Sequence, residues 1–106
     1  MKVFLSPLAE FKLTKLLLLL EKEWGKSAKD KFLNKLKDKF TQVSGHPHSN
    51  PKAEDFDDIH WCVVTPQTSF YYRVSEKEKE IEVITFTDNR QNPESIIKEI
   101  RSYFKA

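Results

Sequence analysis

The sequence predicts an α+β fold in which an N-terminal helical hairpin packs on one face of an antiparallel β-sheet, in the order β-α-α-β-β-β-α. Three observations lead to this prediction. Apolar residues recur at helical spacing over residues 9–24 and again over 32–43. A last apolar stripe of the same kind covers 96–104. Between these helices lie runs rich in β-branched and aromatic residues, at 59–65, 69–75 and 80–87.

Length and composition favour one small domain with a real core. The chain has 106 residues, of which 39% are hydrophobic and 12% aromatic. Its single cysteine, Cys62, excludes a disulfide framework and is expected to pack as a small hydrophobe. The longest apolar run, Leu16–Leu20, is far too short for a membrane span, and the N-terminus has no signal-peptide pattern. The expected compartment is therefore the cytoplasm, with no membrane partner.

Charge is distributed unevenly along the chain although the formal net charge is only +2. Residues 1–45 carry a net charge of +5, and residues 46–88 carry −5. A basic half beside an acidic half is compatible with a nucleic acid or an acidic protein as partner. The signal is weaker than that of a dedicated nucleic-acid binder.

The first strand, 2–5, leads directly into the first helix. Ser6 is a favourable N-cap, and Pro7 suits the first helical position, where a missing N–H costs nothing. Leu18 and Leu19 widen the apolar stripe, which predicts that this helix is covered on more than one side. The stripe itself consists of Ala9, Leu13, Leu16, Leu17, Leu20 and Trp24.

Gly25 ends the first helix, and the pair Ser27 and Asp30 predicts a capping box for the second. The second helix buries a face marked by Phe32, Leu33, Leu36, Phe40 and Val43. Its many lysines fit a solvated face better than a phosphate-binding face. Two helices separated by so few residues are expected to pack antiparallel.

The loop 45–58 contains His46 and His48, but no third ligand lies nearby, so no metal site is expected.

The strand 59–65 has apolar residues at both odd and even positions, so both of its faces are expected to be covered and the strand to be central in the sheet. The next two strands form a hairpin around the charged connection 75–80.

A dense polar cluster, 88–92, follows the last strand, and Pro93 closes it. Side chains able to bind phosphate or an amide are thus placed where a strand ends and a loop begins. The alternative is a turn with a helix cap, in which Arg90 pairs with Asp88 or Glu94. Asn92 and Pro93 can start the last helix, whose stripe either completes the core or docks on a partner.

Known enzyme motifs are absent from the sequence. Only two glycines occur, so there is no Gly-rich phosphate loop, and neither serine nor cysteine lies in a nucleophile motif. No cofactor is expected.

The order and spacing of these pieces resemble the RelE/ParE superfamily of toxins from bacterial type II toxin–antitoxin systems. The matching pieces are VFLSPLAEFKL, EKEWG, FLNKLKDKF, SFYYRV and IEVITFTDNRQNP, which cover nearly the whole chain up to Pro93. The resemblance implies one RelE/ParE-like toxin domain over residues 1–106, with residues 93–106 as a C-terminal helix.

Function, as the resemblance implies it, is growth inhibition in a plasmid-stabilisation system. The partner is a cognate antitoxin whose flexible segment wraps the toxin. One branch of the superfamily cleaves mRNA on the ribosome, and another inhibits DNA gyrase. The alternative is an inactive relative that serves as a non-catalytic protein-interaction module on the same fold.

The resemblance also proposes catalytic residues for the nuclease branch, in which positioned cations stabilise phosphoryl chemistry. Arg90 matches the basic residue that ends the last strand. His60 stands where relatives often carry Arg, and Arg73 lies in the neighbouring strand. Tyr103 is a distant match for the C-terminal Tyr or His of the family. Tyr71 and Tyr72 are expected to pack or pair in the sheet.

Overall fold

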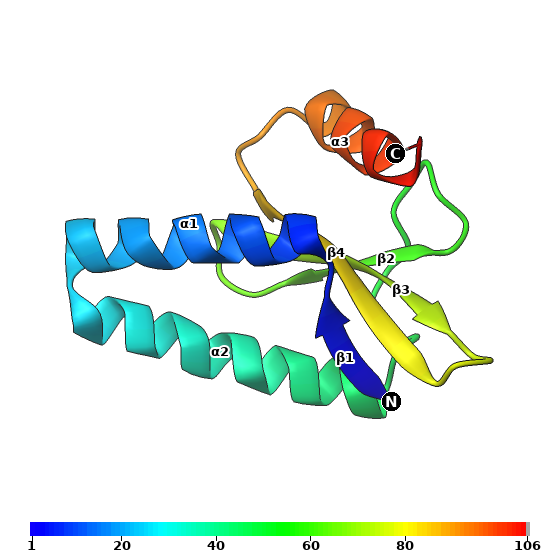
Figure 1. Ribbon diagram of the computed structural model, residues 1–106, viewed down its shortest axis with the longest axis horizontal. Helices are drawn as coiled ribbons and strands as arrows, with labels where there is room; N and C mark the ends of the chain where they lie inside the picture. The colour runs from blue at the N-terminus through cyan, green and yellow to red at the C-terminus, as the bar shows by residue number, and fades with distance from the viewer. Residues whose placement is uncertain (106) are drawn as a thin grey trace.

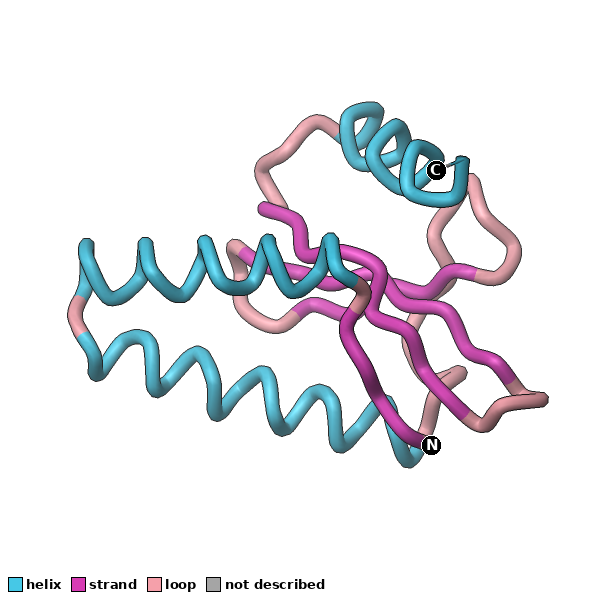
Figure 2. Tube along the Cα trace, viewed as in Figure 1, coloured by secondary structure: helices cyan, strands magenta, loops and turns pink. Residues whose placement is uncertain are grey.

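The computed structural model describes residues 1–105, and the last residue of the predicted helix 93–106 lies outside them. The predicted order β-α-α-β-β-β-α is confirmed (Figures 1 and 2). The elements are β1 (Lys2–Leu5), α1 (Pro7–Trp24), α2 (Lys26–Gly45), β2 (Ile59–Val63), β3 (Thr68–Ser75), β4 (Glu80–Asp88) and α3 (Pro93–Lys105).

The sheet is mixed, so the expectation of an antiparallel sheet is wrong for one pair of strands. The spatial order is β1-β4-β3-β2, and β1 pairs with β4 in parallel while the other neighbours are antiparallel. Parallel strands cannot be joined by a tight turn, because the chain must cross back to the same end of the sheet. The helical hairpin between β1 and β2 provides that crossing.

The strand β2 lies at the edge of the sheet, which corrects the expectation that it is central. The prediction rested on apolar residues at both odd and even positions of β2, a pattern typical of central strands. The strand shows this pattern at the edge because it is covered on both faces and also along its outer edge. There the loop backbone pairs with the strand through a bridge between Lys52 and His60. Trp61 N–H also donates to the Pro51 carbonyl at 3.0 Å.

A single residue, Gly25, joins the two helices. Its φ of 90° lies in the left-handed region, which favours glycine, and its N–H donates to the Glu21 carbonyl at 2.9 Å. The helix α2 begins at Lys26 with Gly25 in the N-cap position and no side-chain cap, so the predicted Ser27 cap is wrong. One glycine both ends α1 and starts α2, and no residues remain for a separate cap.

Ser6 connects β1, α1 and β4. As predicted, its side chain caps α1: the Oγ accepts from the Ala9 N–H at 2.9 Å. The same hydroxyl donates to the Ile84 carbonyl at 2.7 Å, and the Ser6 N–H donates to the Val83 carbonyl at 2.9 Å. The residue is 1% exposed, so both partners depend on this hydroxyl rather than on water.

A β-bulge in β4 lies beside Ser6. Tyr71 pairs with Thr85 and Tyr72 pairs with Val83, which leaves Ile84 as an extra residue without a partner in β3. The bulge turns both Ile84 and Thr85 toward α3, while Val83 faces the helical hairpin.

Two apolar clusters therefore lie on opposite faces of the sheet. The larger is between the sheet and the helical hairpin, and it includes Phe32, Leu36, Phe70, Tyr72 and Val83. The smaller is under α3 and consists of Ile59, Ile84, Ile96 and Ile100, with partly buried neighbours. The stripe of the last helix thus completes this chain's own core. Cys62 is 2% exposed and packs in the larger cluster, as expected.

The outer side of α1 is not covered, contrary to the prediction from Leu18 and Leu19. These side chains are 63% and 54% exposed, and Trp24 at the end of the helix is 75% exposed. Helical periodicity identifies a face but does not show whether another element lies over it.

In the part of the chain that the structure describes, no helix is long and apolar enough to span a membrane.

We expect Ser6→Ala to lower the free energy of unfolding by about 2–4 kcal/mol, since it removes an N-cap and leaves a buried carbonyl unpaired. Urea denaturation followed by circular dichroism measures the change. Ser102→Ala on the exposed side of α3 is the control and should change stability by less than about 0.5 kcal/mol. A Ser6→Ala loss as small as that of the control would contradict the role of this hydroxyl.

Candidate functional site

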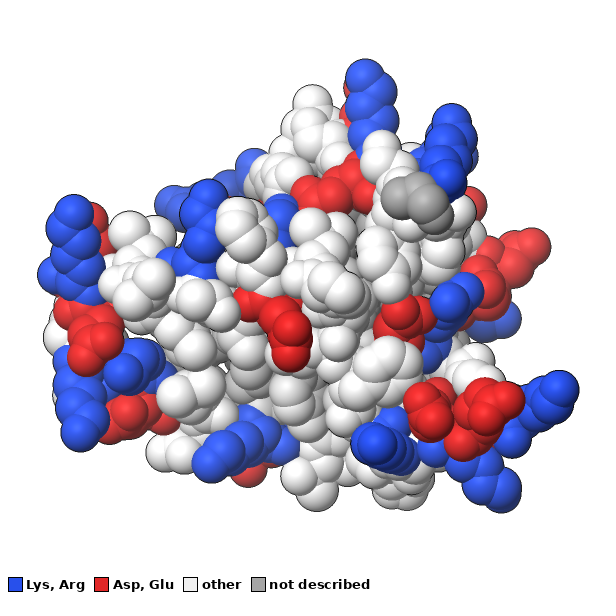
Figure 3. All heavy atoms as spheres, viewed as in Figure 1, with Lys and Arg blue, Asp and Glu red and all other residues white. Residues whose placement is uncertain are grey.

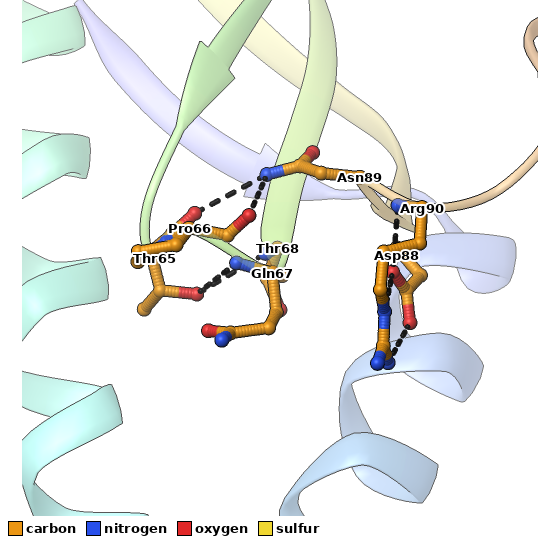
Figure 4. A network of polar contacts seen from close by, with 7 residues as sticks. All are labelled: Thr65, Pro66, Gln67, Thr68, Asp88, Asn89 and Arg90. Carbon is orange, nitrogen blue, oxygen red and sulfur yellow. Dashed lines mark hydrogen bonds and ion pairs between the residues drawn. The ribbon is translucent and has the colours of Figure 1, made fainter.

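The polar loop that follows β4 is fixed to the turn between β2 and β3 (Figure 4). The Asn89 side-chain amide donates to the carbonyls of Thr65 and Pro66, at 3.2 and 3.0 Å. Its oxygen accepts from the Ser69 hydroxyl at 2.6 Å, and its backbone N–H donates to the Gln67 carbonyl at 2.7 Å. These bonds hold the end of β4 rigidly, so a side chain in the loop has a defined position.

Arg90 extends from this loop but is engaged by a neighbour. Its Nε and Nη2 donate to the two carboxylate oxygens of Asp88, at 3.1 and 2.8 Å, and its backbone N–H donates to the same carboxylate at 2.8 Å. The hydrogen bonds from the Arg90 side chain and backbone lower the pKa of Asp88 from its ordinary value of 3.8 to about 2. The alternative prediction, a turn in which Arg90 pairs with Asp88, is therefore what the structure contains.

Two shallow hollows flank the loop. One, of about 220 Å³, is lined on the helical-hairpin side by Lys12, Leu16 and Asp88, among others. The other, of about 370 Å³, lies on the opposite face next to Trp61, Tyr71 and Asn89. Gln91 borders both hollows, and Arg90 borders neither. The side chains at these positions are suited to hydrogen bonding and apolar contact with a partner.

Arg73 lies on the face of the sheet that α3 covers. Its Nε donates to Glu82 at 2.8 Å, and its guanidinium lies over the Phe104 ring, 4.8 Å from the centroid. The Tyr103 hydroxyl donates to the other oxygen of Glu82. Burial raises the pKa of Tyr103, and the hydrogen bond to the Glu82 carboxylate raises it further. The C-terminal helix thus lies over Arg73, whose charge is matched by the Glu82 carboxylate.

His60 lies on the opposite face, toward the helical hairpin. It pairs with Tyr72, and its ring stacks on the Tyr72 ring with the centroids 5.3 Å apart. Its Nδ1 donates to the Asn50 carbonyl at 2.9 Å, and the residue is only 4% exposed. The His60 ring therefore holds the 46–53 loop against the sheet. Tyr72 adds a second contact to this loop, since its hydroxyl donates to the Pro47 carbonyl at 2.9 Å.

The three predicted catalytic residues are therefore not brought together. His60 and Arg73 lie on opposite faces of the sheet. Arg73 in β3 pairs with Glu82 in β4, whereas Thr68 pairs with Asp88 at the end of β4. Arg73 and the end of β4 are thus about 17 Å apart along the strands, at 3.4 Å per residue.

Sequence reasoning missed the residues that hold α3. Glu99 accepts from Thr85 Oγ1 at 2.6 Å and pairs with Lys12 at 2.8 Å, which links α3 to both β4 and α1. Only the position of Glu99 between the buried Ile96 and Ile100 marked it in the sequence. Among residues 1–105, no group of three or more His, Cys, Asp or Glu side chains is placed to hold a metal ion.

Comparison with solved structures places this architecture among known folds. The chain aligns with a chromosomal ParDE toxin–antitoxin system from P. aeruginosa at a TM-score of 0.68 and 12% identity, over 83% of this chain and 95% of the other. The chain has the fold of the RelE/ParE toxins. The expected resemblance to that superfamily is confirmed at the level of the fold.

Two further solved structures support this assignment. A YoeB/ParE toxin from Agrobacterium tumefaciens aligns at a TM-score of 0.60 and 17% identity, over 84% of this chain and 99% of the other. The toxin in the intact E. coli RelBE toxin–antitoxin complex aligns at 0.59 and 15%, over 85% and 98%. No family model matches the sequence, and no curated protein matches it significantly. The toxin fold is thus recognised from structure at identities too low to transfer function.

We expect the carboxylate of Asp88 to titrate near pH 2 in the wild-type chain. In Arg90→Ala its pKa should rise but stay below 3.8, because the backbone N–H of residue 90 still donates to it. Because the pKa is lowered on folding, the stabilisation from this pair is complete above pH 3.8 and is lost as the pH falls toward 2. The effect on overall stability is small because the pair is exposed to solvent. Carbon-detected NMR of the side-chain carboxyl measures the pKa.

Arg101→Ala, an exposed cation on α3, is the matched control and should leave the Asp88 pKa unchanged. A wild-type Asp88 that titrates at its ordinary pKa would show that Arg90 is free to bind another anion.

Proposed function

We propose that this chain is the toxin of a type II toxin–antitoxin pair and that it inhibits growth by binding DNA gyrase rather than by cutting mRNA. The toxin role is supported by the fold, which matches solved toxins over 95–99% of their length. The resemblance left these two activities open as alternatives. Gyrase inhibition is the one that requires no cluster of catalytic cations.

The observation that carries this choice is the separation of the basic candidates. Cleavage of RNA without a metal needs cations aimed together at one phosphate, where they stabilise developing charge. Here Arg90 is held by Asp88, Arg73 by Glu82, and His60 is buried on the other face. An RNA phosphate near Arg90 would also meet the carboxylate of Asp88, with its pKa of about 2. This arrangement favours contact with a protein over phosphoryl chemistry.

A cognate antitoxin is the proposed partner, since one solved neighbour is a toxin–antitoxin complex. With it go the further proposals of a role in plasmid stabilisation and a cytoplasmic site of action. The second candidate is an inactive relative that only binds a partner. It is favoured by the same neutralised Arg90, and growth arrest separates it from the first.

We expect expression of the wild-type chain alone, in its native host or a close relative, to arrest growth, and co-expression of the neighbouring gene to relieve the arrest. Arg90→Ala should arrest growth to the same extent, because this guanidinium is not used on RNA. Colony counts after induction measure toxicity, and primer extension on abundant transcripts detects cleavage.

Loss of arrest in a folded and soluble Arg90→Ala variant, with cleaved transcripts in the wild type, would restore the nuclease hypothesis. No arrest by soluble wild-type protein would favour the inactive relative. Lys98→Ala, an exposed cation on α3, controls for the loss of one surface charge.

A further inference from the structure

A hollow of about 190 Å³ lies between α3, the sheet and the loop that precedes β2. Three parts of the chain form its walls: the segment 53–56 of the loop, the strands β2 and β3, and one side of α3. We call this space the aromatic hollow. It is lined by Phe56, Trp61 and Tyr71, by the carboxylates of Glu54 and Asp55, and by apolar side chains of α3.

A tight turn holds Glu54 and Asp55 beside the hollow. The Phe56 N–H donates to the Ala53 carbonyl at 3.1 Å, which closes a turn with the two acids at its centre. The Ala53 N–H donates to the Ile59 carbonyl at 2.7 Å and so fixes the turn to β2. The two carboxylates therefore have a defined place at the rim of the hollow.

The negative charge of this loop is not neutralised within the described chain. Asp57 and Asp58 follow the turn, and none of the four carboxylates in 54–58 forms a salt bridge within residues 1–105. Figure 3 shows acidic side chains at the right of the view, where Figure 1 places this loop beside α3. Among residues 1–105, no lysine or arginine lines the hollow. The hollow therefore attracts cations and repels phosphates.

Aromatic rings form the rest of the polarisable surface. Trp61 and Tyr71 are directly paired across β2 and β3, so their side chains lie side by side on the face that α3 covers. The Phe56 ring already holds one cation, since the Arg101 guanidinium lies 5.8 Å from its centroid. An aromatic ring attracts a cation that lies within about 6 Å of its centroid. Rings together with carboxylates are the surroundings that an organic cation requires.

Other classes of ligand fit this lining less well. A hard metal ion such as Ca²⁺ takes roughly six to eight oxygen ligands, whereas the lining offers two carboxylates. A neutral apolar ligand would fill the space without using either carboxylate. An RNA phosphate would meet the unpaired acids of the loop.

The shape of the surface favours a linear ligand. The second hollow, of about 370 Å³, adjoins the first, because Trp61 and Tyr71 line both. Together the two hollows form a trough that runs from the acids of the turn, across the two rings, to Gln91. A chain molecule lies along such a trough, whereas a side chain of a partner protein enters a hollow end-on.

We propose that the aromatic hollow binds a small linear aliphatic amine. Its ammonium group lies against Glu54 and Asp55, its apolar stem crosses Trp61 and Tyr71, and a polar far end reaches the amide of Gln91. This inference does not depend on the proposed function, because it concerns a different ligand.

The test is a titration with aminopentanol, a linear amine with a hydroxyl at its far end, followed by two-dimensional NMR of the indole N–H groups. We expect a saturable shift at Trp61 and none at Trp24, which lies at the end of α1, outside the hollow. Pentanediol, in which a hydroxyl replaces the ammonium group, should bind about tenfold more weakly or worse, because it lacks the charge.

Removal of the two carboxylates tests their role directly. Glu54→Gln combined with Asp55→Asn should raise the Kd of aminopentanol by about tenfold or more, since the ammonium group loses both partners. The matched control is Glu23→Gln combined with Asp30→Asn, the same changes at exposed positions near the turn between the two helices. This control should leave Kd within about twofold, because distant exposed charges are screened.

Equal binding of aminopentanol and pentanediol, or no saturable shift at Trp61, overturns the inference. An unchanged Kd in the double variant of the turn, with the rest of its spectrum unaltered, also overturns it. Tighter binding of acetyl-lysine methylamide than of aminopentanol assigns the hollow to a protein side chain and overturns it as well. None of these outcomes depends on growth arrest, so the proposed function stands or fails separately.

Discussion

The hydroxyl of Ser6 is the contact on which the two-sided arrangement of this fold depends. It caps α1 through the Ala9 N–H and at the same time pairs the carbonyl of Ile84 in the bulge of β4. The bulge turns Ile84 and Thr85 toward α3, where Ile84 joins the smaller core and Thr85 bonds Glu99. One buried side chain thereby fixes the start of the helical hairpin and the strand geometry under the C-terminal helix.

Local chemistry was enough to predict the elements, but not how they pair or what covers them. Ser6 and Pro7 marked the start of α1, and the apolar spacing marked the three helices. The parallel pairing of β1 with β4 depends on contacts about 80 residues apart, which no local pattern encodes. The bulge at Ile84 is equally hidden, because an extra residue in a strand leaves its composition unchanged.

In the candidate site, the sequence allowed prediction only of contacts between residues that are close together along the chain. The pairing of Arg90 with Asp88, two residues away, was one of two alternatives visible in the sequence. The placement of His60 and Arg73 on opposite faces follows from the register that pairs His60 with Tyr72, and a shift of one residue would reverse it. The outer side of α1 was also misjudged, although the lysines beside Leu18 and Leu19, Lys15 and Lys22, are typical of a solvent-exposed face.

We propose that this toxin fold acts through its surfaces, without a cluster of catalytic cations. Purified protein added to a reconstituted translation reaction with labelled mRNA, and in parallel to a gyrase supercoiling reaction, tests it most directly. We expect intact mRNA, normal translation and inhibited supercoiling. Ribosome-dependent cleavage of the mRNA, with gyrase unaffected, would contradict it.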